Sequence, residues 1–319
     1  MEKLGRNLIL AVALGVAVFL VITFLSDFGE LKSALANFDL ALVPVILGLV
    51  TLSYAGRFVR WLYYLRVLKV SVPLGQNAAI FVAGLSMTIS PGKLGEVLKS
   101  VFVRQASGAP IARTAPAVVA ERATDGTGMV AWGFIGAFAL GLSPFYVFVF
   151  LAIAIFGIVV LRSARLSRLA ERVLLKLPLL DRLAPHLRAF HGSSNELLGT
   201  RPLVVGTVIS FLSWGLECFA VYLCAVGLGA DVGFLMVVFV FAVSSLLGVL
   251  SMIPGGIGAV EAGLALQFVR LAGMSAGLAG ALTLVIRLAT LWWATLLGIL
   301  GLLLIRRMLG DAPIESASD

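Results

Sequence analysis

Charged residues are scarce in this chain. Asp, Glu, Lys and Arg make up 13% of its 319 residues, whereas apolar residues make up 61% and the mean hydropathy is +1.09. Soluble domains have a charged fraction of about 25%. The composition therefore excludes an ordinary soluble protein and predicts an all-α polytopic membrane protein, with residues 1–319 forming a single membrane domain.

Residue types that commonly bind metals are also few. The chain has two cysteines and two histidines. Cys218 and Cys224 lie six positions apart in one apolar stretch. This spacing fits neither a zinc site nor an obvious disulfide, so we expect both to be buried packing residues. The sequence shows no Walker loop and no zinc-ligand spacing, and we expect no cofactor, no metal site and no enzymatic activity.

Acidic residues are fewer than basic ones. The chain has 16 Asp and Glu and 24 Lys and Arg, which gives a net charge of +8. A basic chain can bind nucleic acid. Here, however, the basic residues cluster where apolar stretches end, as they do in loops that follow the positive-inside rule. We expect them to face the anionic lipids of a bacterial inner membrane, and we expect no nucleic-acid partner.

Long apolar stretches predict membrane-spanning helices over residues 7–26, 40–65, 113–141, 144–162, 202–229 and 276–305. The stretch 7–26 follows Lys3 and Arg6 and continues into Asp27 without a small-residue cleavage site. We interpret it as a retained signal-anchor helix.

Two further apolar stretches, 74–106 and 232–272, are each interrupted by a Pro-Gly turn. Proline removes a backbone donor and glycine permits sharp turns, so each stretch is predicted to form two half-length helices in a re-entrant hairpin. A single span at each place is the alternative. The predicted turn residues are Pro91, Gly92 and Gly95 in the first stretch, and Pro254, Gly255, Gly256 and Gly258 in the second.

The charge distribution favours hairpins. Residues 162–201 contain eight Lys or Arg against three Asp or Glu, so this segment should be cytoplasmic. With both hairpins re-entrant, both termini are cytoplasmic and the halves 40–162 and 202–307 form an inverted repeat whose breaks meet near the midplane. Residues 163–201 are then a cytoplasmic amphipathic connector, and 308–319 are a short tail.

Charges inside apolar stretches are the candidate site residues. Arg122 and Arg287 each follow a break by about thirty positions. Inserting a charged side chain at the centre of a membrane helix costs about 2.5 to 3.5 kcal/mol of free energy. The two arginines bind the phosphate of a headgroup, pair internally, for example Arg287 with Glu217 or Glu261, or do both, since a site arginine needs a counter-charge when the site is empty. The predicted transport path consists of Lys93, Glu96, Glu121, Arg122, Asp125, Glu217, Glu261 and Arg287.

Another basic and aromatic group lies near the inner end of the helix predicted at 40–65. We interpret it as an interfacial belt that anchors this helix, with headgroup binding as the alternative. Its members are Arg57, Arg60, Trp61, Tyr63 and Tyr64.

Residues 10–307 resemble the flippase-like family that includes the transmembrane region of lysylphosphatidylglycerol synthase, with uncharacterised and hopanoid-associated members. The resemblance implies translocation of anionic, aminoacylated, isoprenoid or polyprenyl-linked lipids. It rests on Pro91-Gly92-Lys93-Leu94-Gly95-Glu96, on Glu121-Arg122 with Asp125, on Pro254-Gly255-Gly256-Ile257-Gly258 with Glu261, and on Arg287.

Three functions follow from these observations. The first is a lipid flippase-like transporter with a lateral opening, in which Arg287→Leu abolishes translocation while the protein still folds. The second is a membrane enzyme that acts on lipid phosphates. The third is a non-transporting partner of envelope-lipid synthesis enzymes, in which Arg287 and its acidic partner can be replaced together by apolar residues without a phenotype.

Overall fold

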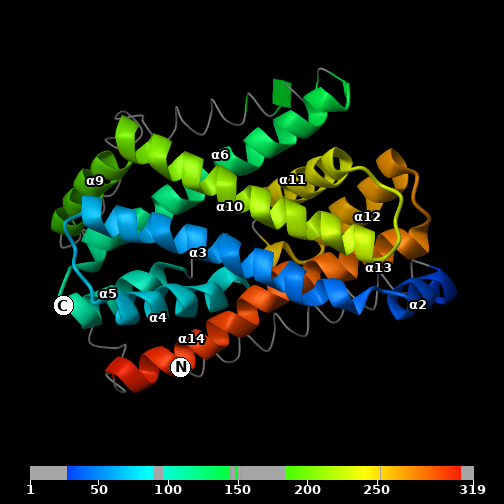
Figure 1. The fold of residues 1–319 in the computed structure, drawn as a ribbon. Coiled ribbons are helices and arrows are strands. Elements are labelled where there is room, and N and C mark those ends of the chain that lie inside the picture. Colours follow the sequence, from blue (N-terminus) through cyan, green and yellow to red (C-terminus); the bar gives the residue numbers. More distant parts are fainter. Residues whose placement is uncertain are drawn as a thin grey trace.

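The computed structural model describes residues 27–89, 96–143, 184–251 and 253–309, together with residues 145, 148, 149 and 152. Every regular element in these ranges is a helix (Figure 1). Three helical stretches are long and apolar enough to span a membrane, and they are Leu40–Val67, Thr200–Gly227 and Ala276–Met308. The prediction of an all-α membrane protein is confirmed.

Several predicted segments lie outside the described residues. These are the signal-anchor helix 7–26, most of the helix 144–162, the connector up to residue 183, and the tail from residue 310. The first Pro-Gly turn, with Pro91, Gly92, Lys93 and Gly95, also lies outside them.

The two halves contain the same order of elements. The first half has α3 (Val43–Val67), α4 (Leu74–Leu85), the short η2 (Ser86–Ile89), α5 (Leu98–Ser107) and α6 (Ile111–Ala139). The second has α10 (Thr200–Gly227), α11 (Phe234–Leu250), η5 (Pro254–Gly256), α12 (Ala259–Ala272) and α13 (Ala276–Arg287). A π-helical turn, η6 (Leu288–Trp292), joins α13 to α14 (Trp293–Leu309). Each half is thus a long helix, two short helices with a break between them, and another long helical segment.

Two described helices fall outside this scheme. Helix α2 (Phe28–Ala36) was not predicted from the sequence. It begins where the Asp27 side chain accepts a hydrogen bond from the Glu30 backbone N–H at 3.0 Å. It packs on α13. Helix α9 (Ala184–Leu197) forms the end of the predicted connector and packs on α6, where Arg113 contacts both carboxylate oxygens of Glu196.

Helices α3 and α10 lie side by side and run in opposite directions (Figure 1). At one end the Asp39 backbone N–H, just before α3, donates to the carbonyl of Gly227 at the end of α10. Near the other end, Gly206 of α10 faces the Tyr64 hydroxyl, which would lie 2.0 Å from a β-carbon there. Glycine at such a crossing permits the close approach of membrane helices, which lack a hydrophobic drive to associate.

The short helices pack on the opposite half. Helix α4 packs on α14, and α11 packs on α6. A β-carbon on Gly301 of α14 would lie 2.5 Å from the Ala83 nitrogen, and one on Gly136 of α6 would lie 2.8 Å from the Phe239 β-carbon. These glycines are 165 positions apart, as are Arg122 and Arg287. The reciprocal contacts therefore use corresponding positions of the two halves.

The helices that precede and follow each interrupted segment are in contact. Arg113, near the start of α6, donates to the carbonyl of Leu68 at the end of α3, so α4 and α5 lie between two neighbouring helix ends. At the opposite end, Leu228 after α10 packs with Leu31, Ala281 and Leu284 of α2 and α13. The second interrupted segment, α11 to α12, therefore also lies between two helices that contact each other.

The two breaks meet inside the bundle. Elements η2 and η5 are in contact, and Ile89, Ile257 and Leu291 form a small buried cluster between the breaks and η6. Both sets of half-helices thus point their broken ends toward one central region.

Candidate functional site

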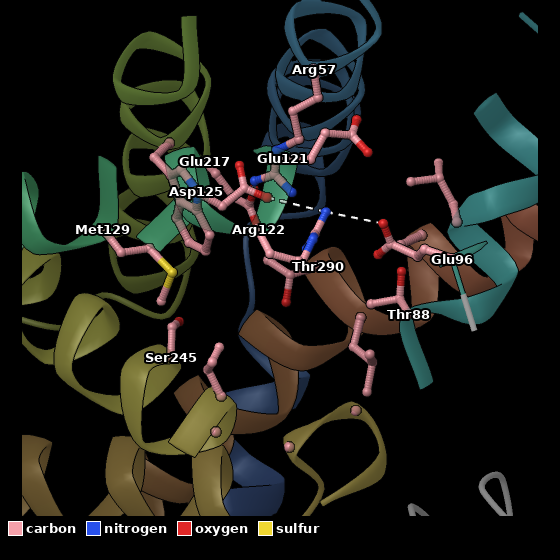
Figure 2. A pocket seen from close by; sticks show the side chains of 18 of the residues that line it. Arg57, Thr88, Glu96, Glu121, Arg122, Asp125, Met129, Glu217, Ser245 and Thr290 are labelled. Carbon is pink, nitrogen blue, oxygen red and sulfur yellow. Dashed lines mark hydrogen bonds and ion pairs between the residues drawn. The ribbon is translucent and has the colours of Figure 1, made fainter. Parts of the chain in front are cut away.

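A cavity of about 220 Å³ lies in this central region, with walls from both breaks and from α3, α6 and α10. Figure 2 shows acidic and basic side chains from several helices pointing into it. Of the residues that the structure describes, five basic and four acidic ones line it: Arg57, Arg60, Lys99, Arg122, Arg287, Glu96, Glu121, Asp125 and Glu217. Ionisable side chains are rare within membrane bundles and commonly mark substrate or ion pathways.

One wall is a chain of alternating charges between α5 and α6. The Lys99 amine lies 2.5 Å from the Glu121 carboxylate and 3.6 Å from that of Glu96. Arg122 donates to Glu96 at 3.0 Å, the pair joined by the dashed line in Figure 2, and lies 3.2 Å from Asp125. Glu121, Arg122 and Asp125 of the predicted transport path thus lie in one wall, where Arg122 pairs with Asp125 and Glu121 pairs with Lys99.

Arg122 is the most accessible of these charges. Its side chain is 28% exposed, whereas those of Glu96 and Asp125 are 8% and 6% exposed. A guanidinium that is held by two carboxylates and still accessible can exchange one of them for another anion. Arg122 is therefore the side chain in this wall best placed to meet a ligand.

Arg57 and Arg60 of α3 also face the cavity. Arg60 is fully buried, and its Nη1 donates to Asp125 at 2.7 Å and to the Thr124 hydroxyl at 3.1 Å. Arg57 forms an ion pair with Glu217 of α10, and its guanidinium lies 4.9 Å from the centre of the Trp214 ring.

The interpretation of this segment as an interfacial belt is wrong. Trp61 and Tyr64 are fully buried with Arg60, Arg57 is 9% exposed, and only Tyr63 is partly exposed. The Trp61 indole donates to the Asn77 side chain at 2.8 Å, so its polar group is satisfied inside the protein. The residues lie near the end of an apolar stretch, but α3 is covered there by neighbouring helices. Arg57 lies three and four positions before Arg60 and Trp61, so these side chains share one face of the helix. This spacing was the signal in the sequence that could have predicted their burial together.

Arg287 forms the internal bridge that the sequence analysis considered. Its Nε donates to Glu261 at 2.7 Å, and its Nη2 donates to the carbonyl of Gly255 at 2.8 Å. The second Glu261 oxygen accepts from the backbone N–H of Gly258 at 2.7 Å. The bridge therefore ties α13 to the second break, whereas Glu217, the other proposed partner, pairs with Arg57.

The second break has the backbone that its glycines predict. Gly255, Gly256 and Gly258 have φ angles of 63°, 62° and 93°, in the region that glycine adopts without a steric penalty. Pro254 begins the short η5 turn. Cys218 and Cys224 are buried, as predicted, and neither forms a disulfide.

Relatives of this chain are membrane proteins without a stated activity. Two matches to UPF0104 membrane proteins of Methanothermobacter thermautotrophicus are 34% and 39% identical over 120 and 97 residues. They cover 38% and 30% of this chain, and this chain spans only 36% and 28% of those relatives' length. A UPF0104 membrane protein of Pyrococcus horikoshii is 23% identical over 317 residues, covering 91% of this chain and 94% of the relative.

The family model described as the transmembrane region of lysylphosphatidylglycerol synthase matches residues 11–298. This match includes both breaks, every charged residue that lines the cavity and the Arg287–Glu261 bridge. The chain belongs to this family of integral membrane proteins.

Proposed function

We propose that the protein is a lipid flippase-like transporter that moves a polar or phosphate-bearing headgroup across a cell membrane. The observation that carries the proposal is a cavity with charged walls at the junction of two helix breaks, inside a bundle whose outer faces carry exposed Leu, Val and Phe side chains. A headgroup would enter the cavity while its acyl chains stay against the apolar exterior through a lateral opening. The proposal is transport without catalysis, with membrane lipids as the partners.

We further propose that the two halves form an inverted repeat of re-entrant hairpins, with both termini in the cytoplasm. The antiparallel α3 and α10, the reciprocal packing of α4 on α14 and of α11 on α6, and the contact between η2 and η5 support this architecture. The relatives named above are archaeal, so the proposed membrane is the cytoplasmic membrane of its host, the inner membrane in a bacterium.

This topology predicts which exposed positions face each side of the membrane. Cysteines introduced as Ser71→Cys and Ser107→Cys, which flank the first interrupted segment, should react with a membrane-impermeant maleimide only from the cytoplasmic side. Asp231→Cys and Ala276→Cys, which flank the second, should react only from outside. The unmodified chain is the control because its own cysteines are buried. Labelling of Ser71→Cys and Ser107→Cys from opposite sides would instead make the first segment a single span.

The transport proposal predicts a large effect of Arg122→Gln. The amide cannot bind a phosphate as a cation, so we expect translocation of fluorescent phospholipids in proteoliposomes to fall at least about tenfold. The fold should persist because the Arg122 side chain is 28% exposed.

A matched control is Arg113→Gln on the same helix. Arg113 has a 29% exposed side chain and binds Glu196 away from the cavity, so translocation should be unchanged. The panel should contain anionic, aminoacylated and polyprenyl-phosphate lipids. Equal translocation by both variants, or no translocation of any lipid by well-folded protein, would contradict the proposed function.

A further inference from the structure

One guanidinium edge of Arg60 has no acceptor among the described residues. Its Nη1 is held by Asp125 and Thr124, but its Nε and Nη2 are buried and have no hydrogen-bond partner among the described residues. These two nitrogens form the side edge of the guanidinium, whose parallel N–H groups match two oxygens of a carboxylate or phosphate. A buried donor without an acceptor is costly, and here two adjacent donors of one cation share that condition.

Other donors around the cavity share this condition. Arg57 Nε, Arg122 Nε and the Trp214 indole Nε1 are also buried without an acceptor in the part of the chain that the structure describes. These three side chains and that of Arg60 all line the cavity. Among the described cavity-lining acceptors, Asp125 Oδ2 alone is buried without a hydrogen bond, and it forms an ion pair with Arg122 Nη2 at 3.2 Å. Among the described groups of the cavity wall that are buried without a hydrogen bond, donors therefore outnumber acceptors.

We infer that the Arg60 side edge, in the wall of a cavity that Arg57 and Trp214 also line, is a binding site for a phosphate oxyanion. Two phosphate oxygens would accept from Arg60 Nε and Nη2, and a further oxygen would accept from Arg57 or Trp214. Because Asp125 and Thr124 already fix the Arg60 guanidinium, little side-chain entropy remains to be lost on binding. The nitrogens are shielded from water in this state, so binding requires the side chains that cover them to shift.

This inference rests on the proposed function for the source of the phosphate, which would be a lipid headgroup. It assigns recognition to α3, whereas the sequence pattern directed attention to Arg122 and Arg287. In this arrangement Arg287 maintains the second break, Arg122 is the accessible cation at the cavity wall, and Arg60 is the fixed receptor.

The test uses the full chain purified in detergent. Ligand binding is measured as the shift that the ligand causes in the midpoint temperature of thermal unfolding. The probes are dihexanoyl phosphatidic acid, sodium phosphate and dihexanoylglycerol at equal ionic strength. We expect dihexanoyl phosphatidic acid to raise the midpoint and dihexanoylglycerol, which lacks the phosphate, to leave it unchanged. Equal stabilisation by dihexanoylglycerol would overturn the inference.

Arg60→Lys is the decisive variant, because lysine keeps the charge that pairs with Asp125 but has no side edge. We expect its apparent affinity for dihexanoyl phosphatidic acid to be at least about tenfold lower. Arg66→Lys, an exposed position on the same helix, is the matched control and should bind as the parent does. An unchanged affinity in Arg60→Lys would overturn the inference.

Trp214→Phe provides a second variant, because it removes one donor and keeps the aromatic ring next to Arg57. We expect a smaller but measurable loss of affinity. If Arg60→Lys does not fold, an unchanged affinity in Trp214→Phe would overturn the inference.

The outcomes separate this site from the transport proposal. Binding that depends on Arg60 in a protein that translocates no lipid supports the site and contradicts transport. Translocation with unchanged binding in Arg60→Lys supports transport and contradicts the site. If sodium phosphate binds as tightly as dihexanoyl phosphatidic acid and also requires Arg60, the site holds and its ligand is the free ion.

Discussion

Arg287→Leu is expected to lower the free energy of unfolding by about 3 to 5 kcal/mol, because it leaves Glu261 buried without its cation. Glu261 is 2% exposed, and the Arg287 side chain is 8% exposed. The substitution also removes the donor to the Gly255 carbonyl, which fixes the second break. Chemical denaturation of the purified protein in mixed micelles measures the change, and a variant as stable as the parent would show that the bridge is not formed.

The double variant Arg287→Leu with Glu261→Leu separates structure from transport. Replacing both partners of a buried ion pair by apolar residues is often neutral or stabilising, so most of the lost stability should return. If the restored protein translocates lipid, the bridge serves the fold alone. If it is stable but inactive, Arg287 or Glu261 also acts in transport, in agreement with the predicted transport path that includes both.

Gly298→Ala is expected to destabilise the protein by about 3 kcal/mol or more, the upper part of the range for overpacked cores. A β-carbon at Gly298 of α14 would lie 2.0 Å from the backbone nitrogen of Ser86 and 2.5 Å from its α-carbon. Backbone atoms cannot rotate away, so α14 and α4 must separate. Because Ser86 begins η2, separation would also move the first break, and translocation should fall with stability.

Gly75→Ala is the matched control for this substitution. Gly75 lies in α4 at an exposed position, and a β-carbon there would have no atom within 4 Å. Alanine favours a helix over glycine by about 1 kcal/mol, so this variant should be as stable as the parent or slightly more stable. Denaturation of both variants in the same detergent makes the comparison, and an equal effect of the two substitutions would rule out a close contact between α4 and α14.

The helical spans could be predicted from sequence because they depend on local composition. The helix predicted over 202–229 is observed as Thr200–Gly227, and that over 40–65 as Leu40–Val67. The second break was predicted for the same reason, since its glycines adopt a backbone that other residues rarely do. Helix α2 was missed because nine residues carry little helical preference of their own, and its packing on α13 is a long-range contact.

The choice of ion-pair partners could not be predicted. The sequence showed that Arg287 needed a compensating charge but left Glu217 and Glu261 as equal candidates. Glu217 pairs instead with Arg57, which lies 160 positions away. Such pairings depend on which helices cross and at what register, and a shift of one helix by two residues would rotate a side chain out of reach.

The sequence by itself determined that this protein is an all-helical membrane protein with two Pro-Gly interruptions and charges that need compensation, because hydropathy and backbone restriction are properties of short segments. Only the tertiary structure decided that Arg57 and Arg60 face a cavity, that Arg287 fixes the second break, and that one edge of Arg60 has no acceptor within the described part of the chain. These features arise where helices from both halves cross, and side chains far apart in sequence become neighbours only through that packing.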